Sequence, residues 1–561
     1  MKRAAEAGEE LDLSRRGNNV LRATAIRDLL RADGLDPLGI RVTGARITGE
    51  LDLEFVRASV PLLLDDCVFE ESLSFLRTEL PALSLHGSTF PGLLGEGMRT
   101  GYLGLENSRC GGTVDLDNAR VDGPLLLSDS SMWSFRGGGL QVSRSVVAQG
   151  LFVRADHEGD ALWLDGCDIA GELDLERAVI VNGSGTALVA NNAKIGGKIT
   201  LDDALLKAGS DGAALVLIDS SAGGLTARAT VLRSDSDNAI TLDGTHFRAE
   251  VKLVAGFDAR SRRAGETIRM IDTRIDAGLV IRGSVRADSG QALSLERGLI
   301  GASITIKDSV FEADSDESAV RIADSSVAGE LVFKPEKLIN NGDGLELSLG
   351  GTKVGGLLGL DVPDLLEAEI FTVAVDGFTY PEPPEDTGAW LTMLRDCTFA
   401  YHPQPYQQLA AVHRAAGHEH TARKVLIAQQ RDLRRRGDPG NKLWHWFLGV
   451  TLGYGYRPAR AVAGLVITFL LALCLVWTTN AYNGLTPAKD RPADACSPVN
   501  RISLAADLAI PLVKLGGTPR CELANGPAGQ WATGAGWVIQ ILGWSFATLS
   551  VAGFTGLVRK S

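Results

Sequence analysis

A repeat of about 26 residues runs through the middle of the chain and constrains its fold more than any other feature. Aliphatic residues recur there in two interleaved series. The first series is Leu162, Leu188, Leu215, Ile240, Ile268, Leu293, Val320 and Leu345, and the second is Leu173, Ile199, Leu225, Val251, Leu279, Ile304, Leu331 and Leu357. A shorter spacing continues the signal towards the N-terminus at Val42, Leu62, Leu83, Leu103, Leu125 and Leu140. A fixed period of this length is typical of a solenoid.

Short segments such as LDL, ITL and ITI alternate between two faces, which is the periodicity of a β-strand. The period leaves no room for crossover helices. We therefore predict a mainly β fold: a long single-stranded parallel β-helix over residues 40–360, with a rise of about 4.8 Å per coil. The usual hand of parallel connections favours a right-handed coil. We assign Leu215 to an inward position and Val216 to an outward one.

Polar turns recur once per coil and align along one predicted edge of the β-helix. They are rich in Asp, Asn, Ser and Gly, and they occupy residues 182–185, 209–212, 234–238, 287–290, 314–318 and 340–344. Two interpretations remain open. The edge is either an acidic docking strip or cation site, or a row of solvated turns, since turns require these residue types.

Both ends of a β-helix expose open rungs and need a cover. Residues 1–39 are predicted to form an N-terminal helical cap, with Asn19 as the N-cap of its helix. Residues 361–404 lose the period and gather proline, which indicates a C-terminal cap or linker. Residues 405–460 match the spacing of one tetratricopeptide-type helix pair with Gly417 at the turn, so we predict a basic helical hairpin connector there.

Two uncharged stretches near the C-terminus predict a transmembrane hairpin. Residues 461–482 contain no charge over 22 positions, which is enough to cross a hydrocarbon core of about 30 Å. Residues 531–558 form a second apolar stretch that carries Trp531, Trp537 and Trp544. Residues 483–530 then form the outer loop. The alternative is that both stretches are buried helices of a soluble domain.

The flanking charges predict the orientation of this hairpin. Residues 401–460 hold ten Lys or Arg against three Asp or Glu, a net of +7 within a chain of net charge −13, which leaves −20 elsewhere. The residues that we expect to set the topology are Arg434, Arg435, Arg436, Arg457, Arg460, Arg559 and Lys560. Because basic flanks stay inside, both termini should be cytoplasmic in a multi-pass protein of the plasma membrane. The acidic remainder argues against a nucleic-acid partner.

Cys496 and Cys521 are the two cysteines of the predicted outer loop, 25 residues apart. If the loop faces an oxidising compartment, they should form a disulfide. Two unpaired thiols are the alternative, because the sequence does not show that the two Cβ atoms approach each other.

Signals for enzymatic chemistry are weak. The glycine-rich stretches at 95–101 and 350–359 lie among predicted strands rather than between a strand and a helix, so they lack the context of a dinucleotide-binding loop. His413, His418 and His420 suggest a metal site, but Gly417 separates the first from the other two. We therefore identify no catalytic residue, no metal ligand and no cofactor.

Several segments together carry a resemblance. They are ARITGELDL at 45–53, PQPYQQLAAVHRAAGHEHTARKVLIAQQ from residue 403, GYGYRPAR before the first apolar stretch, IPLVKLG at 510–516, and LGWSFATLSVAGFTGLVRK at the end. They resemble bacterial membrane-anchored β-helix proteins that are commonly labelled membrane-associated oxidoreductases. The resemblance covers nearly the whole chain. It implies the architecture, and the label implies redox chemistry.

Two functional hypotheses follow. The first is a membrane-anchored cytoplasmic β-helix scaffold or sensor that presents an acidic binding surface under the membrane, with the lipid bilayer and a protein bound to the β-helix as partners. The alternative is a membrane-associated oxidoreductase, or another enzyme, that uses one face of the β-helix.

Overall fold

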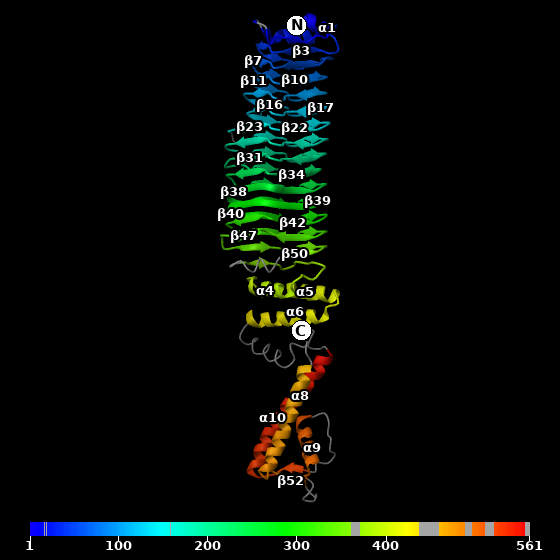
Figure 1. Cartoon of the computed structure of the whole chain (residues 1–561), viewed down its shortest axis with the longest axis vertical. Helices are drawn as coiled ribbons and strands as arrows, with labels where there is room; N and C mark the ends of the chain where they lie inside the picture. Colours follow the sequence, from blue (N-terminus) through cyan, green and yellow to red (C-terminus); the bar gives the residue numbers. More distant parts are fainter. Residues whose placement is uncertain are drawn as a thin grey trace. The chain divides into compact units, whose positions relative to one another are not determined.

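The computed structural model describes residues 1–15, 17, 19–156, 159–360, 371–436, 459–488, 496–510 and 521–555. The chain divides into two compact units, residues 1–408 and 409–561, and each is described by itself. The first unit is a parallel β-solenoid of about 13 turns followed by helices (Figure 1). The β-helix predicted from the repeat is therefore confirmed.

Each full coil of the solenoid carries four short strand segments. Equivalent segments of successive coils pair in parallel, so the solenoid has four ladders, numbered here in chain order. Ladders 1, 2 and 3 form one sheet of 39 strands, because the long strands β38 (Val251–Ile271) and β40 (Leu279–Glu296) run through all three. Ladder 4 is a separate sheet of 12 strands.

Ladder 1 contains the first part of β38 and β40 and the strands β1 (Leu11–Asp12), β3 (Ile40–Thr43), β6 (Leu62–Asp65), β10 (Leu83–Ser84), β14 (Leu103–Gly104), β18 (Leu125–Leu126), β22 (Val146–Val147), β26 (Leu173–Asp174), β30 (Lys198–Thr200), β34 (Gly224–Arg228), β42 (Ile304–Lys307), β46 (Leu331–Lys334) and β50 (Leu358–Leu360). Ladder 2 contains the middle part of β38 and β40 and the strands β2 (Val20–Arg22), β4 (Arg46–Thr48), β7 (Val68–Phe69), β11 (Thr89–Phe90), β15 (Arg109–Cys110), β19 (Ser131–Met132), β23 (Phe152–Ala155), β27 (Val179–Asn182), β31 (Leu205–Ala208), β35 (Val231–Ser234), β43 (Val310–Ala313) and β47 (Lys337–Asn340).

Ladder 3 contains the last part of β38 and β40 and the strands β5 (Leu51–Asp52), β8 (Leu73–Ser74), β12 (Leu93–Leu94), β16 (Thr113–Asp115), β20 (Ser134–Arg136), β24 (Leu162–Trp163), β28 (Leu188–Val189), β32 (Leu215–Val216), β36 (Ile240–Thr241), β44 (Ser318–Ala323), β48 (Leu345–Ser348) and β51 (Val373–Ala374). Ladder 4 contains β9 (Glu79–Leu80), β13 (Arg99–Thr100), β17 (Arg120–Val121), β21 (Gln141–Val142), β25 (Asp168–Ile169), β29 (Lys194–Ile195), β33 (Ser221–Ala222), β37 (His246–Phe247), β39 (Arg274–Ile275), β41 (Leu299–Ile300), β45 (Ser326–Val327) and β49 (Lys353–Val354).

The two sequence series correspond to two of these ladders. The first series follows ladder 3 and the second follows ladder 1. Leu215 is fully buried and Val216 is half-buried, as the inward and outward assignment requires.

The register at the ends of the series differs from the prediction. Val320 pairs with Leu347 rather than Leu345, and Leu331 pairs with Leu358 rather than Leu357. In the early coils Ile40 and Val146 occupy the ladder 1 positions that were assigned to Val42 and Leu140. Aliphatic residues stand one or two positions apart at several of these sites, so composition alone does not fix which one points inward.

Buried hydroxyl groups join successive coils at the corner after ladder 3. The Thr273 hydroxyl donates to the Leu242 carbonyl at 2.8 Å, and the Thr352 hydroxyl donates to the Ile322 carbonyl at 2.8 Å. Thr78, Ser220, Thr245 and Ser325 make equivalent bonds. Each bond satisfies a polar group inside the solenoid and fixes one coil to the previous one.

The N-terminal cap is less helical than predicted. Val20–Arg22 is strand β2, which pairs with β4, and helix α2 (Ala23–Leu30) begins only after it; a separate helix α1 (Lys2–Ala7) precedes both. Asn19 does not cap the helix, because its side-chain amide donates to the Gly44 carbonyl at 3.2 Å. The exposed edge of the first coil pairs with Val20–Arg22, so tertiary pairing overrides the local helical pattern.

Helices follow the last coil of the solenoid in the chain. Ladder 3 continues past residue 360 to β51, and helix α4 (Thr387–Asp396) begins at Asp386, whose carboxylate accepts from the backbone N–H groups of Gly388 and Ala389. Helices α5 (Pro403–Ala415) and α6 (Glu419–Arg436) form the predicted helical pair, with Gly417 left-handed at a φ of 80° between them.

The second unit contains α6 and an apolar helical hairpin. Helices α8 (Ala459–Ala481) and α10 (Pro527–Thr555) pack against each other (Figure 1). Between them lie strand β52 (Leu485–Pro487), helix α9 (Pro498–Ala509) and strand β53 (Cys521–Leu523), and the two strands pair antiparallel. Helix α10 begins four residues before the stretch predicted to start at 531.

Candidate functional sites

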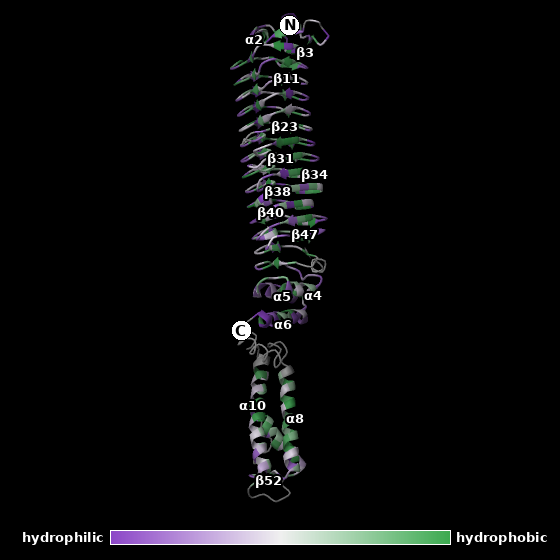
Figure 2. Ribbon diagram, turned by 90° about the vertical axis from the view of Figure 1, so that its left-hand side faces the viewer, coloured by the Kyte–Doolittle hydropathy of each residue, from purple (hydrophilic) through white to green (hydrophobic). Residues whose placement is uncertain are grey.

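Helices α8 and α10 are long and apolar enough to cross a membrane, over Ala461–Ala481 and Pro527–Val551 (Figure 2). Only 28% and 22% of their most apolar windows are buried. Ile467, Trp537 and Ile541 are 58%, 66% and 66% exposed. A core helix of a soluble protein would have most of this surface covered, so by length, composition and exposure the two helices could cross a membrane.

Three of the predicted topology-setting residues lie in the last turn of α6. Arg434, Arg435 and Arg436 follow one another there, and the guanidinium of Arg436 pairs with the buried carboxylate of Asp432 at 3.3 Å. Arg457, Arg559, Lys560 and the side chain of Arg460 lie outside the described residues.

The segment that joins the two apolar helices is cross-linked. Cys496 and Cys521 form a disulfide with their Cα atoms 5.2 Å apart. The bond ties the residue before the N-cap of α9 to the first residue of β53. The Arg501 guanidinium also donates to the Cys496 carbonyl at 3.0 Å, which holds the first turn of α9 at the same place.

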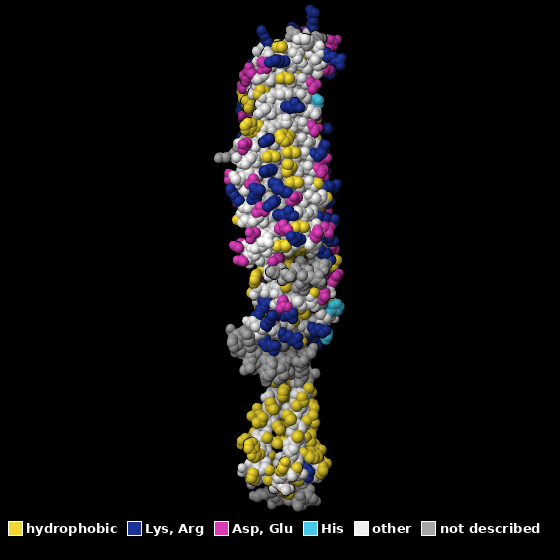
Figure 3. All heavy atoms as spheres, turned by 60° about the vertical axis from the view of Figure 1, so that its left-hand side comes forward, with side chains coloured by type: hydrophobic (Ala, Val, Ile, Leu, Met, Phe, Trp, Pro, Cys, Tyr) yellow, Lys and Arg dark blue, Asp and Glu magenta, His cyan; other side chains and the backbone are white. Residues whose placement is uncertain are grey.

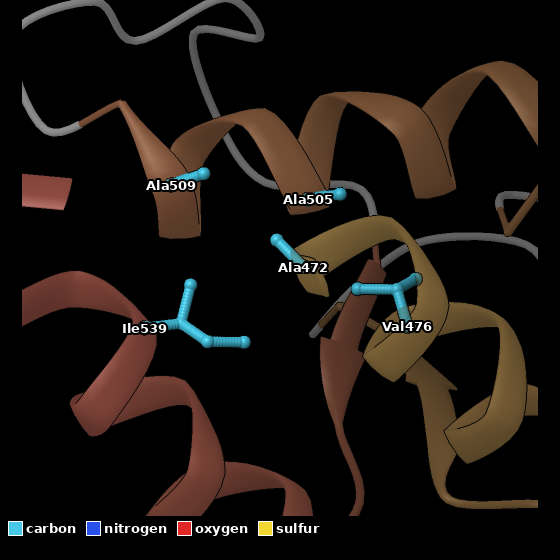
Figure 4. Close-up of a cluster of buried hydrophobic side chains, with 5 residues drawn as sticks. All are labelled: Ala472, Val476, Ala505, Ala509 and Ile539. Atoms are coloured by element: carbon cyan, nitrogen blue, oxygen red, sulfur yellow. The ribbon is translucent and has the colours of Figure 1, made fainter. Parts of the chain in front are cut away.

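Helix α9 packs against both apolar helices. Ala505 and Ala509 of α9 contact Ala472 and Val476 of α8 and Ile539 of α10 in one buried cluster (Figure 4). The small-residue face of α9 therefore lies against the two apolar helices.

Small residues permit this close packing. A Cβ atom added at Gly464 of α8 would lie 2.5 Å from the Phe546 ring of α10. Helices that associate in membranes approach each other at such small residues.

The polar turns lie at the corner between ladders 2 and 3, as the alignment predicted. Their side chains hold the turns together. The Asn340 amide donates to the carbonyls of Ser315 and Leu345 at 2.9 and 3.0 Å, and the Asn182 amide donates to those of Gly159 and Thr186 at 2.5 and 3.0 Å. These contacts favour the interpretation of the edge as a row of solvated turns. They do not favour a cation site or a docking strip.

Burial shifts the pKa of three thiols of the solenoid and of His413. Burial raises the pKa of Cys67 and Cys110 to about 11 and that of Cys167 to about 12, so little reactive thiolate forms. The His413 and His418 rings are 5.9 Å apart, and burial followed by the charge of His418 lowers the pKa of His413. Across the described ranges no three His, Cys, Asp or Glu side chains are grouped to hold a metal ion.

An apolar strip lies on the outer face of ladder 2. Phe152 is 41% exposed, and Val179, Leu205 and Val231 continue its column on the following coils, half-buried. Figure 3 shows Lys and Arg side chains gathered around hydrophobic side chains on the middle coils. Apolar strips with a charged rim are common at interaction surfaces.

The outer face of ladder 1 changes sign along the solenoid. In each coil we take the residue that follows the inward ladder 1 residue by three positions, and these residues stack into one column. The column is acidic or neutral in the early coils and, where charged, basic in the later ones. Its charged members are Asp65, Glu106, Glu176 and Asp202, then Arg228, Arg282, Lys307 and Lys334. Among the described residues of this column, the acidic side chains therefore lie in the N-terminal half of the solenoid and the basic ones in the C-terminal half.

A hollow of about 770 Å³ opens where the basic half begins. It is lined by Arg228, Lys252, Val254, Ala255, Gly256, Val280, Arg282, Gly283 and Asp308. None of these residues was predicted to form a site. The available signal was the spacing of the second series, which lengthens to 28 from Val251 to Leu279 and then shortens to 25 up to Ile304.

Comparisons of the chain with protein-family models, with curated proteins and with solved structures found no match.

Proposed function

We propose that the chain is a membrane-anchored scaffold or sensor. Helices α8 and α10 cross the plasma membrane as a hairpin, both termini are cytoplasmic, and the solenoid presents a binding surface to a protein or ligand under the membrane. The observation that carries the proposal is the pair of long apolar helices whose side chains the chain itself leaves exposed.

Charge and disulfide chemistry support the proposed orientation. The basic turn Arg434–Arg436 precedes α8 in the chain, and Arg559 and Lys560 follow α10, so basic residues flank both ends of the hairpin. Basic flanks are retained on the cytoplasmic side. The disulfide Cys496–Cys521 belongs to the connecting segment, and disulfides persist in oxidising compartments.

The solenoid supports the scaffold or sensor role. Stacked coils present long, rigid columns of side chains at fixed spacing, which suits the recognition of extended partners. The apolar strip of ladder 2 and the two-signed column of ladder 1 are the surfaces available for such binding.

A reporter fusion tests the topology. Alkaline phosphatase, which is active only outside the cytoplasm, should be active when inserted after the exposed Asn525 and inactive when fused after Ser561. Activity at Ser561 and none at Asn525 would reverse the orientation and remove the cytoplasmic solenoid. Activity at neither or at both positions would contradict the hairpin.

A further inference from the structure

We propose that the hollow on ladder 1 binds a phosphate-bearing small molecule that also has an apolar part. The residues that define the site are Arg228, Lys252, Arg282, Val254 and Val280.

The hollow results from a mismatch in coil length at one corner. Between the ladder 1 and ladder 2 positions, the coil from Val251 to Asp258 advances seven residues and the next coil, from Leu279 to Ser284, advances five. The flanking coils advance six, from Leu225 to Val231 and from Ile304 to Val310. A short coil next to a long one recedes from the surface, so a recess forms at this corner. Bulges of this kind are frequent next to binding sites.

Glycine makes the short coil possible. Gly283 has a φ of 153°, and a Cβ atom added there would lie 2.2 Å from the Phe257 carbonyl oxygen. Ala255 and Gly256 of the long coil have φ values of 51° and 93°. A left-handed residue occupies the Ala255 position in most coils, as Ala229 and Asp308 do, so only Gly256 and Gly283 depart from the repeat. These two glycines mark the lengthened and the shortened coil on either side of the recess.

Two guanidinium groups at the hollow have no acidic partner. Within the described part of the chain, neither Arg228 nor Arg282 forms an ion pair, and both are exposed, whereas Lys252 pairs with Glu250. Elsewhere on the solenoid outward arginines are often paired with a carboxylate of a neighbouring coil, as Arg260 is with Asp288 at 2.8 Å and Arg297 with Asp272 at 2.7 Å. The lining therefore holds two guanidinium groups without an ion pair, together with one carboxylate, that of Asp308, and the Lys252–Glu250 pair, so its net charge stays positive.

The chemistry of the lining selects the ligand. A guanidinium donates two parallel hydrogen bonds to a phosphate, and two of them at one recess favour a multiply charged oxyanion. Val254, Ala255 and Val280 supply an apolar wall beside these donors. The volume of about 770 Å³ lies within the range of small-molecule sites. A phosphate group joined to an apolar moiety satisfies both parts of the lining.

This inference rests on the proposed function in one respect, since it names the kind of ligand that the solenoid would sense. Binding can be measured on the detergent-solubilised chain, where the direction in which α8 and α10 cross a membrane does not matter. A wrong topology prediction would therefore leave the binding result intact. A failed binding experiment would likewise leave the topology prediction intact.

Calorimetric titration of the full chain in detergent with inorganic pyrophosphate tests the site. The double variant Arg228→Gln/Arg282→Gln should bind at least about tenfold more weakly than the natural chain, because charge-assisted hydrogen bonds from both guanidinium groups are lost. The variant Arg228→Lys/Arg282→Lys should recover part of the affinity, since it restores the charge but not the bidentate geometry.

The matched control is Arg99→Gln/Arg109→Gln, which removes two exposed arginines from other ladders of the same solenoid. It should bind pyrophosphate as the natural chain does. Absence of pyrophosphate binding by the natural chain would overturn the proposal, and so would equal loss of affinity in the double variant and the control.

Native mass spectrometry of the chain purified from membranes distinguishes two sources of the phosphate. A phospholipid mass that the natural chain retains and the double variant Arg228→Gln/Arg282→Gln loses would identify a lipid headgroup as the ligand. Pyrophosphate binding without such a lipid difference would identify a soluble phosphorylated compound.

Discussion

The solenoid and the helix pair α8–α10 are built from similar aliphatic and small residues, but they cover them in different ways. In the solenoid each inward side chain is covered by the coils before and after it, so Leu215 and Ile281 are fully buried. In the helix pair many large side chains stay uncovered, with Ile541 66% exposed and Trp531 84% exposed. A stacked repeat therefore buries its own apolar side chains, whereas a pair of helices of similar composition leaves many of them exposed.

Hydroxyl groups show the same contrast. In the solenoid Thr273 donates to a carbonyl of another coil, 31 residues earlier in the chain. In α8 Thr468 donates to the carbonyl of Gly464, four residues earlier in its own helix. Side chains in the solenoid thus connect distant parts of the chain, whereas those in the helices satisfy local groups. Four substitutions test how far this comparison extends.

The largest effect is expected from Leu215→Asp. The substitution removes a fully buried aliphatic side chain and places a carboxylate between coils, where no cation lies opposite it, so the free energy of unfolding should fall by about 4 kcal/mol or more. Urea unfolding of the full chain, followed by far-ultraviolet circular dichroism, measures the loss.

Val216→Asp is the matched control for this substitution, because Val216 is the next residue and points outward, half-buried. Its cost should stay below about 1 kcal/mol. Similar losses in both variants would show that the inward and outward faces of the strand are not distinct.

The second substitution, Ile541→Asp, acts on the uncovered surface of α10. If the membrane covers Ile541, an Asp near the centre of the helix should oppose insertion by about 3 kcal/mol and release a large fraction of the chain on alkaline extraction of membranes. Gln530→Asp, in the first turn of the same helix, is the control and should remain membrane-bound. Equal extraction of the two variants would indicate that α10 is not embedded.

The fold was predictable wherever one residue class repeats at one position. Ladders 1 and 3 carry Leu, Ile or Val at nearly every inward position, so their spacing is visible in the sequence. Ladder 4 was not predicted, because its inward positions include Thr100, Ala222 and Phe247 and so do not carry one residue class throughout. Ladder 2 is equally mixed. The sequence therefore predicts only two of the four ladders of each coil.

The candidate sites were predictable to different degrees. Charge-free length alone located the two apolar helices, and two cysteines in one segment suggested the pairing that the structure contains. The hollow depends on which corner of a coil gains or loses a residue, and the repeat spacing does not specify the corner. The packing of α9 also required the structure, because its Ala505 and Ala509 have no distinctive pattern in the sequence.

The third substitution removes the disulfide of the connecting segment. Cys496→Ser/Cys521→Ser opens a cross-link across 25 residues, which should cost roughly 3 kcal/mol in the chain-entropy model. The loss should appear in the stability of the helix pair and not in that of the solenoid. Proteolysis of the connecting segment under native conditions measures it.

Cys474→Ser is the control, because Cys474 is an exposed free cysteine on α8. Mass spectrometry of a non-reduced digest checks the bond directly. Free alkylated thiols at both Cys496 and Cys521 would contradict the cross-link and weaken the assignment of this segment to the oxidising side.

The smallest effect is expected from Thr273→Val, which removes one hydroxyl that joins two coils. Val has nearly the same shape as Thr. The loss of one buried hydrogen bond should lower the free energy of unfolding by about 1 kcal/mol. Thr468→Val is the matched control in α8, where the Gly464 carbonyl can keep its helical hydrogen bond, so its effect should be close to zero. Hydrogen exchange of the coils around Thr273 measures the first change and exchange of α8 measures the second. If both substitutions cost the same, coil-to-coil hydroxyl bonds contribute nothing beyond local ones, and the contrast between the two regions is one of apolar burial alone.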